Sequence, residues 1–125
     1  MILIDTSVWI EFFRQNAKYI PEIESLLNAR QVITVEPIFS ELLYGVMQKR
    51  DKEIVLSYWK VLPRIKFGAS SMLQAAEFAN KLNYYQLGIG LMDAIIVKSA
   101  MDGQHRVWTL DKKITSNIDK KYLYQ

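Results

Sequence analysis

The feature that most constrains the fold is a short apolar strand, near the start of the chain, that stops at an acid. Residues 2–4 read Ile-Leu-Ile, an unbroken run typical of a strand covered on both faces of a parallel sheet. Asp5 ends the run, and Thr6 and Ser7 then favour the start of a helix over 8–13. Ligands bind at the carboxyl edge of open α/β sheets, so Asp5 is a candidate site residue, although capping the helix would also explain it.

Strands and helices alternate along the rest of the chain. Further strands are predicted at 32–35, 64–67 and 106–110, with a short edge strand at 121–124. Helices are predicted from Pro21, from Pro37 to about Gln48, and over 53–62, 70–82, 94–101 and 112–117. This alternation predicts an α/β fold with a central, mostly parallel sheet of four or five strands flanked by helices. With 125 residues and no linker, one domain over 1–125 is expected.

Two connections carry possible ligand-binding chemistry. The Lys-Arg-Asp-Lys run at 49–52 predicts a solvated turn between two helices, although its cations could touch phosphates. The segment 86–92 contains two glycines but lacks the Gly-x-Gly-x-x-Gly spacing and the lysine of phosphate-binding loops. We interpret it as a simple connection.

Composition narrows the chemistry. The chain has no cysteine, which excludes disulfides and thiolate metal sites, and its one histidine, His105, argues against a histidine-rich zinc site. Oxygen ligands remain, and these favour Mg²⁺ or Mn²⁺. No apolar run is long enough to span a membrane and no secretory signal is visible, so a cytoplasmic location is expected. A net charge of +3 is compatible with a nucleic-acid substrate without establishing one.

Three further acids are expected at the same sheet edge as the first. Asp111 directly follows the strand over 106–110, and Glu41 lies about two helical turns after the strand over 32–35. Asp93 precedes a helix that leads into the last strand, so this helix must begin at the carboxyl edge. Each acid alone has an ordinary explanation: Glu41 as a solvated residue, Asp93 as a helix N-cap.

Their shared edge is harder to explain by coincidence. Four carboxylates close together would repel one another and raise each other's pKa unless a cation lies between them. Oxygen-rich clusters are the usual binding sites of hard divalent ions, which activate water and stabilise phosphoryl oxygens. The pattern therefore predicts a Mg²⁺-dependent phosphoryl-transfer or phosphodiester site, without naming the substrate.

Four segments resemble the acidic motifs of the PIN domain, most closely those of VapC-type toxins of toxin–antitoxin pairs. In order they are Ile-Leu-Ile-Asp-Thr-Ser-Val-Trp at 2–9, Ser-Glu-Leu-Leu-Tyr-Gly at 40–45, Gly-Leu-Met-Asp-Ala-Ile-Ile at 90–96 and Trp-Thr-Leu-Asp at 108–111. The resemblance spans nearly the whole chain and implies a three-layer PIN-like fold. One departure lies after the last acid, where the family often has a further acid or histidine and then phenylalanine; here Lys113 and Ile114 follow.

The resemblance also implies a function and its residues. It implies a Mg²⁺- or Mn²⁺-dependent endoribonuclease, a homodimer, neutralised by a VapB-type antitoxin whose C-terminal segment enters a groove. The acidic positions fall on Asp5, Glu41, Asp93 and Asp111 as catalytic and metal-binding residues, with Ser7 and Thr109 as supporting residues. Candidate phosphate contacts are Arg14, Lys49, Arg50 and Lys112, and Tyr44 could stack on a base or meet the antitoxin.

Two other functional classes remain as hypotheses. A receiver-like signalling domain would place paired acids after its first strand and a phosphoacceptor aspartate after its central strand. Here Asp5 is followed by Thr6 and Ser7, and the strand over 64–67 ends in Phe-Gly, which disfavours this class. The other is a catalytically inactive PIN-like module that only binds RNA or protein.

Overall fold

The computed structural model describes all residues from Met1 to Gln125 and is built on one parallel sheet. Its strands are β1 (Ile2–Ile4), β2 (Val32–Val35), β3 (Arg64–Ile65) and β4 (Arg106–Trp108), in the spatial order β3-β2-β1-β4. All neighbouring strands run parallel, with Leu3 of the central strand paired to Ile33 on one side and Val107 on the other. The predicted α/β fold with a parallel sheet is therefore confirmed, with four strands.

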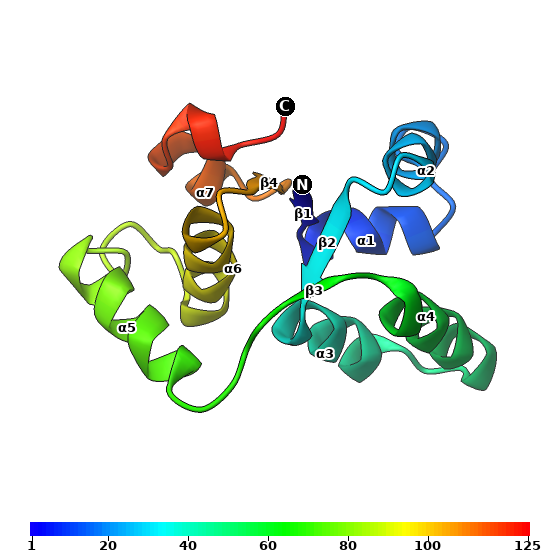
Figure 1. Cartoon of the computed structure of the whole chain (residues 1–125), viewed down its shortest axis with the longest axis horizontal. Helices are drawn as coiled ribbons and strands as arrows, with labels where there is room; N and C mark the ends of the chain where they lie inside the picture. The colour runs from blue at the N-terminus through cyan, green and yellow to red at the C-terminus, as the bar shows by residue number, and fades with distance from the viewer.

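Helices cover the sheet as the alternating pattern predicts. Figure 1 shows α5, α6 and α7 on one side of the strands, with α1, α2 and α4 on the other. Helix α3 contacts both α1 and α6, so it lies across the gap between the two groups. The bounds are α1 (Thr6–Phe13), α2 (Ile20–Asn28), α3 (Glu36–Gly45), α4 (Lys49–Val61), α5 (Ser71–Lys81), α6 (Leu91–Asp102), α7 (Lys112–Asn117) and the 3₁₀ helix η1 (Lys120–Tyr122).

Two apolar clusters fix these helices in place. The larger surrounds the sheet, and within it the ring of Trp9 lies 5.5 to 5.8 Å from four aromatic rings of α1, α3 and α4. The smaller cluster joins the segment before α6, the first half of α6 itself and α7, through Ile89, Ala94, Val97 and Ile114. This second cluster holds the beginnings of α6 and α7 together, and those beginnings carry Asp93 and Asp111.

The charged run at 49–52 is not a turn, contrary to the sequence prediction. Helix α3 already ends at Gly45, the chain is extended at Val46, and α4 begins at Lys49. The β-branched Val46 and the preceding glycine favour the break. Asp51 in the first turn of α4 and Lys60 in its last turn complement the helix dipole, whereas the three cations of the run oppose it at this end. The charged run is nevertheless the first turn of a helix.

The predicted edge strand at 121–124 is also wrong. Residues 120–122 form η1, and only Leu123 makes a single parallel bridge, to Val107. The side chain of Asp119 accepts a hydrogen bond from the backbone N–H of Lys121, which stabilises the tight turn instead of an extended strand. Strands β3 and β4 are shorter than predicted, ending at Ile65 and Trp108.

None of the helices combines the length and the apolar character that crossing a membrane requires.

Candidate active site

Asp5 is the most tightly held acid of the site. It follows β1 and caps α1, and its backbone N–H donates to Trp108 of the neighbouring strand (2.9 Å). Its side chain is only 5% exposed. Oδ1 accepts from the backbone N–H of Thr6 (2.7 Å), and Oδ2 accepts from the hydroxyls of Ser7 (2.9 Å) and Thr109 (2.7 Å). Asp5 is therefore both the N-cap of α1 and an acid of the candidate site.

The first and last acidic segments are joined by hydroxyl groups. The Ser7 hydroxyl, which donates to Asp5, accepts from the backbone N–H of Leu110 (3.1 Å). The Thr109 hydroxyl also donates to Asp5 and accepts from the backbone N–H of Asp111 (3.1 Å). The contact from Thr109 to Asp5 and the contact from Leu110 to Ser7 each span more than 100 residues of sequence. Together they hold Asp111 beside Asp5 at the carboxyl edge of β1 and β4.

Glu41 reaches the cluster from α3 through Thr6, a residue that was not predicted to belong to the site. The hydroxyl of Thr6 donates to Oε1 of Glu41 at 3.0 Å, across 35 residues of sequence. Glu41 itself is exposed, so this contact fixes the direction in which its carboxylate points. The sequence suggested only a capping role for Thr6. Its position directly after Asp5 was the one feature that could have indicated a place in the site.

Asp93 lies in the first turn of α6 and is half-buried. The helix cap is Gly90, so the N-cap role considered for Asp93 is wrong. Burial is the largest cause that raises its pKa, from 3.8 to about 6, followed by the charges of Asp5, Asp111 and Glu41 and a hydrogen bond to Asp111. The four acids therefore lie close enough to act on one another, as expected from the shared edge.

No basic side chain neutralises this cluster. The three ion pairs of the structure join other residues: Arg14 to Glu11, Lys81 to Glu77 and Lys98 to Asp102. The donor set, carboxylates with adjoining hydroxyls, fits the chemistry of a hard divalent cation. As the side chains stand, however, no three acidic groups converge on one point that could hold an ion. The acids therefore form a loose cluster in this structure.

The remaining candidates are spread over the molecule, with Arg14 at the end of α1 opposite to Asp5. Arg14 pairs with Glu11 at 3.8 Å, and Tyr44 is 93% exposed, one turn after Glu41. Lys112 begins α7 beside Asp111. His105 lies at the opposite edge of the sheet, before β4. Its Nδ1 lies 3.2 Å from the amino group of Met1, and burial, then that charge, lowers its pKa.

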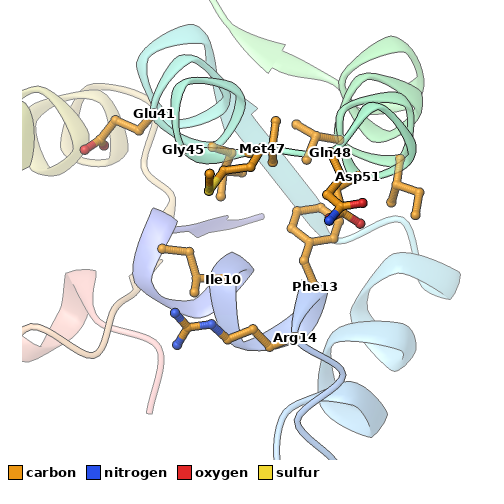
Figure 2. Close-up of a pocket in the computed structure, with 12 residues that line it drawn as sticks. Ile10, Phe13, Arg14, Glu41, Gly45, Met47, Gln48 and Asp51 are labelled. Atoms are coloured by element: carbon orange, nitrogen blue, oxygen red, sulfur yellow. The ribbon is translucent and has the colours of Figure 1, made fainter.

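A groove of about 500 Å³ opens beside Glu41, between α1 and the α3–α4 pair. Figure 2 shows Glu41 at one end of it, Ile10 and Phe13 along the α1 side, and Met47 and Gln48 along the other. Arg14 and Asp51 add charge to a lining that is otherwise largely apolar. A ligand in this groove would lie next to one acid of the cluster.

Comparison with known proteins identifies the family. The model of the PIN domain matches residues 2–121. The chain belongs to the PIN-domain family. This PIN domain is also similar to Ribonuclease VapC32 of Mycobacterium tuberculosis, with 30% identity over 115 residues that cover 91% of this chain and 87% of that protein.

Solved structures share the fold. A chain in the crystal structure of VapBC2 from Rickettsia felis, bound to a DNA fragment from their promoter, aligns with a TM-score of 0.75 and 21% identity, covering 98% of this chain and 96% of that one. A chain in the crystal structure of FitAcB from Neisseria gonorrhoeae aligns with a TM-score of 0.61 and 20% identity, covering 90% and 89%. The three-layer PIN-like fold is therefore confirmed.

Replacing Asp93 by asparagine is expected to stabilise the metal-free protein at pH 8. The folded state holds the Asp93 proton more tightly than the unfolded chain does. The contribution of this group to stability therefore falls as pH rises from about 4 to about 6, and its cost is largest above pH 6. Asp93→Asn removes this cost, and the melting temperature in EDTA should rise by roughly 2–6 °C at pH 8. At pH 5 the gain should shrink, and a variant less stable than the wild type at pH 8 would contradict the shared charge.

Replacing Thr109 by valine tests the hydroxyl contact to buried Asp5. Valine keeps the shape but removes the hydroxyl that donates to Asp5 and accepts from the backbone N–H of Asp111, so the free energy of unfolding should fall by about 1–3 kcal/mol in urea denaturation. Thr115→Val is the matched control, because its hydroxyl makes only one long contact, of 3.4 Å, to Lys112. Equal losses of unfolding free energy in the two variants would show that the Thr109 hydroxyl contributes no more to stability than the Thr115 hydroxyl does.

Proposed function

We propose that this PIN domain is an endoribonuclease that hydrolyses phosphodiester bonds of RNA, acting as a VapC-like toxin. The observation that carries the proposal is the acid cluster, in which Asp93 responds to the charges of three other carboxylates with no compensating base. The match to the PIN domain and the likeness to a ribonuclease support the reaction class.

The proposed cofactor is Mg²⁺ or Mn²⁺, held by Asp5, Asp93, Glu41 and Asp111. When bound, such a cation would supply positive charge that activates water and stabilises the oxygens of the phosphodiester. Asp5 and Asp93 are proposed as the principal ligands. Asp5 is the buried acid of the cluster and accepts a hydrogen bond from Thr109, and Asp93 is the acid whose pKa is raised by burial and by the charges of the other three.

The protein's own residues would prepare the site for this chemistry. Ser7 and Thr109 orient the Asp5 carboxylate, because each donates a hydroxyl hydrogen bond to it. Thr6 directs Glu41 toward the same edge. In the hydrolysis, the oxygen of a water forms a bond to phosphorus in line with the bond to the 3′ oxygen, which breaks. The water gives up a proton and the leaving 3′ oxygen takes one up. The Asp93 carboxyl gives up its proton on cation binding, so binding should weaken as pH falls through about 6.

The partners proposed for the protein are RNA, a VapB-type antitoxin and a second copy of the chain. The largely apolar groove beside Glu41 would admit an antitoxin segment and bring it to the edge of the acid cluster, which would block RNA. One solved structure with the same fold is described as VapBC2 bound to a DNA fragment from their promoter. A cytoplasmic location is proposed with this role.

The alternative is a catalytically inactive PIN-like module that binds RNA or protein. It is favoured by one observation: the acids do not converge on a single ion position as their side chains stand. The alternative and the nuclease differ in one measurable respect, which is cation-dependent cleavage.

The purified protein is expected to cleave single-stranded RNA with Mg²⁺ or Mn²⁺ and to stop in EDTA. Asp5→Asn and Asp93→Asn should each lower the rate roughly a hundredfold or more, as expected when a charge-stabilising group is lost. Gel analysis of labelled RNA fragments measures the rate, and circular dichroism checks folding. Cleavage should also weaken below pH 6 at limiting cation.

Asp119→Asn is the matched control. Asp119 is an exposed aspartate that caps η1, away from the cluster, so its loss should leave the rate unchanged. Full cleavage by the folded double variant of Asp5 and Asp93, or cleavage that resists EDTA, would contradict the proposal. RNA or antitoxin binding without any cleavage would favour the inactive module.

A further inference from the structure

An RNA substrate must approach a pocket that is itself negative. Setting aside the clustered acids leaves nine of the 13 acids against 16 Lys and Arg, so the rest of the molecule carries a net charge of +7. Phosphate contacts from Lys and Arg supply most of the affinity of proteins for nucleic acid. The cations that matter for a substrate in this site are those at the rim of the cluster with no acid of their own.

Lys113 occupies such a position. It is the second residue of α7, two positions after Asp111, and its backbone N–H donates to Oδ1 of that acid at 2.9 Å. Its side chain crosses from α7 to the segment that leads into α6. There it lies along Gly88: a Cβ at this glycine would stand 3.3 Å from Cδ, 3.4 Å from Cε and 3.5 Å from Nζ of Lys113.

The contact with Gly88 organises the lysine in advance. Gly88 has φ of +75°, a conformation that L residues rarely adopt, and its missing side chain leaves the room that the Lys113 stem fills. A lysine lying along backbone loses part of its rotamer freedom in the free protein, so less is lost when it binds a ligand. The ammonium is thereby held between the two elements that carry Asp93 and Asp111.

Lys113 is exposed and takes part in none of the ion pairs. Three of the 16 Lys and Arg differ in this respect: Arg14, Lys81 and Lys98 each have an acidic partner within 4 Å. Lys120 and Lys121 are also unpaired, but they precede Leu123, which bridges to Val107 in parallel with β4. They therefore lie toward the amino edge of the sheet, away from the acids.

We propose that the ammonium of Lys113 binds a backbone phosphate of the RNA substrate, next to the phosphate that enters the acid cluster. This inference rests on the proposed ribonuclease function. An unpaired ammonium on a partly immobilised stem is suited to a phosphate, which it contacts as a point charge. Lys112, one residue nearer to Asp111, would lie beside the same strand of RNA.

The test measures binding of a fluorescein-labelled, mixed-sequence, single-stranded RNA in EDTA across a salt series. Lys113→Gln should weaken binding several-fold and reduce the slope of log K against log salt by about 0.7, the value for one phosphate contact to a single strand. Lys113→Arg should keep most of the affinity. Lys120→Gln is the matched control and should change neither quantity.

Cleavage kinetics with Mn²⁺ provide the second measurement. Lys113→Gln should raise KM several-fold with kcat within about twofold, because the contact serves binding and not bond breaking. Unchanged binding, slope and KM would overturn the proposal, as would equal losses in Lys113→Gln and Lys120→Gln. If no RNA is cleaved but Lys113→Gln selectively weakens RNA binding, the ribonuclease function fails while the phosphate contact stands.

Discussion

The buried carboxylate of Asp5 is the constraint on which the rest of the site depends. A carboxylate removed from water is costly unless its oxygens accept hydrogen bonds. Here three donors meet it at 2.7 to 2.9 Å: the backbone N–H of Thr6 and the hydroxyls of Ser7 and Thr109. Satisfying this one group joins the end of β1, the start of α1 and the segment after β4, and so fixes the edge at which the other acids gather.

The packing of the helices then determines which acids reach Asp5. The smaller apolar cluster holds the beginnings of α6 and α7 together, which places Asp93 next to Asp111. The aromatic cluster around Trp9 ties α1 to α3 and α4, and the Thr6 hydroxyl meets Glu41 across that interface. The fold thus gathers like charges that disfavour one another, and together with burial, which is the larger cause, these charges raise the pKa of Asp93. Such an arrangement is typical of a site that works with a bound cation.

Much of this could be predicted from the sequence because it depends on local patterns. The apolar run before Asp5, the β-branched run at 32–35 and the alternation with helices indicate the parallel sheet, and parallel strands place their following acids at one edge. The helix break at Val46 and the helical start at Lys49 were missed because charge alone does not distinguish a turn from a first helical turn. The edge strand predicted at 121–124 was wrong because the Asp119 side chain accepts a hydrogen bond from the backbone N–H of Lys121, which stabilises η1.

The contacts that sharpen the site could not be predicted in the same way. Thr6 meets Glu41 only because α1 and α3 pack together, and Lys113 meets Gly88 only because α7 lies against the segment before α6. Both depend on distances between elements, which periodicity and spacing do not encode. The role of Asp93 as an acid inside the first turn, with Gly90 as the cap, likewise follows from where the helix begins in three dimensions.

The most direct test of the shared acid cluster is an NMR titration of the side-chain carboxyl carbons of the aspartates in EDTA. We predict that Asp93 titrates with a pKa of about 6 and that Asp111→Asn lowers this value, because the substitution removes a neighbouring charge and weakens a hydrogen-bond acceptor. An Asp93 carboxyl that titrates near 3.8, and is indifferent to Asp111→Asn and Asp5→Asn, would show that the acids do not share one site.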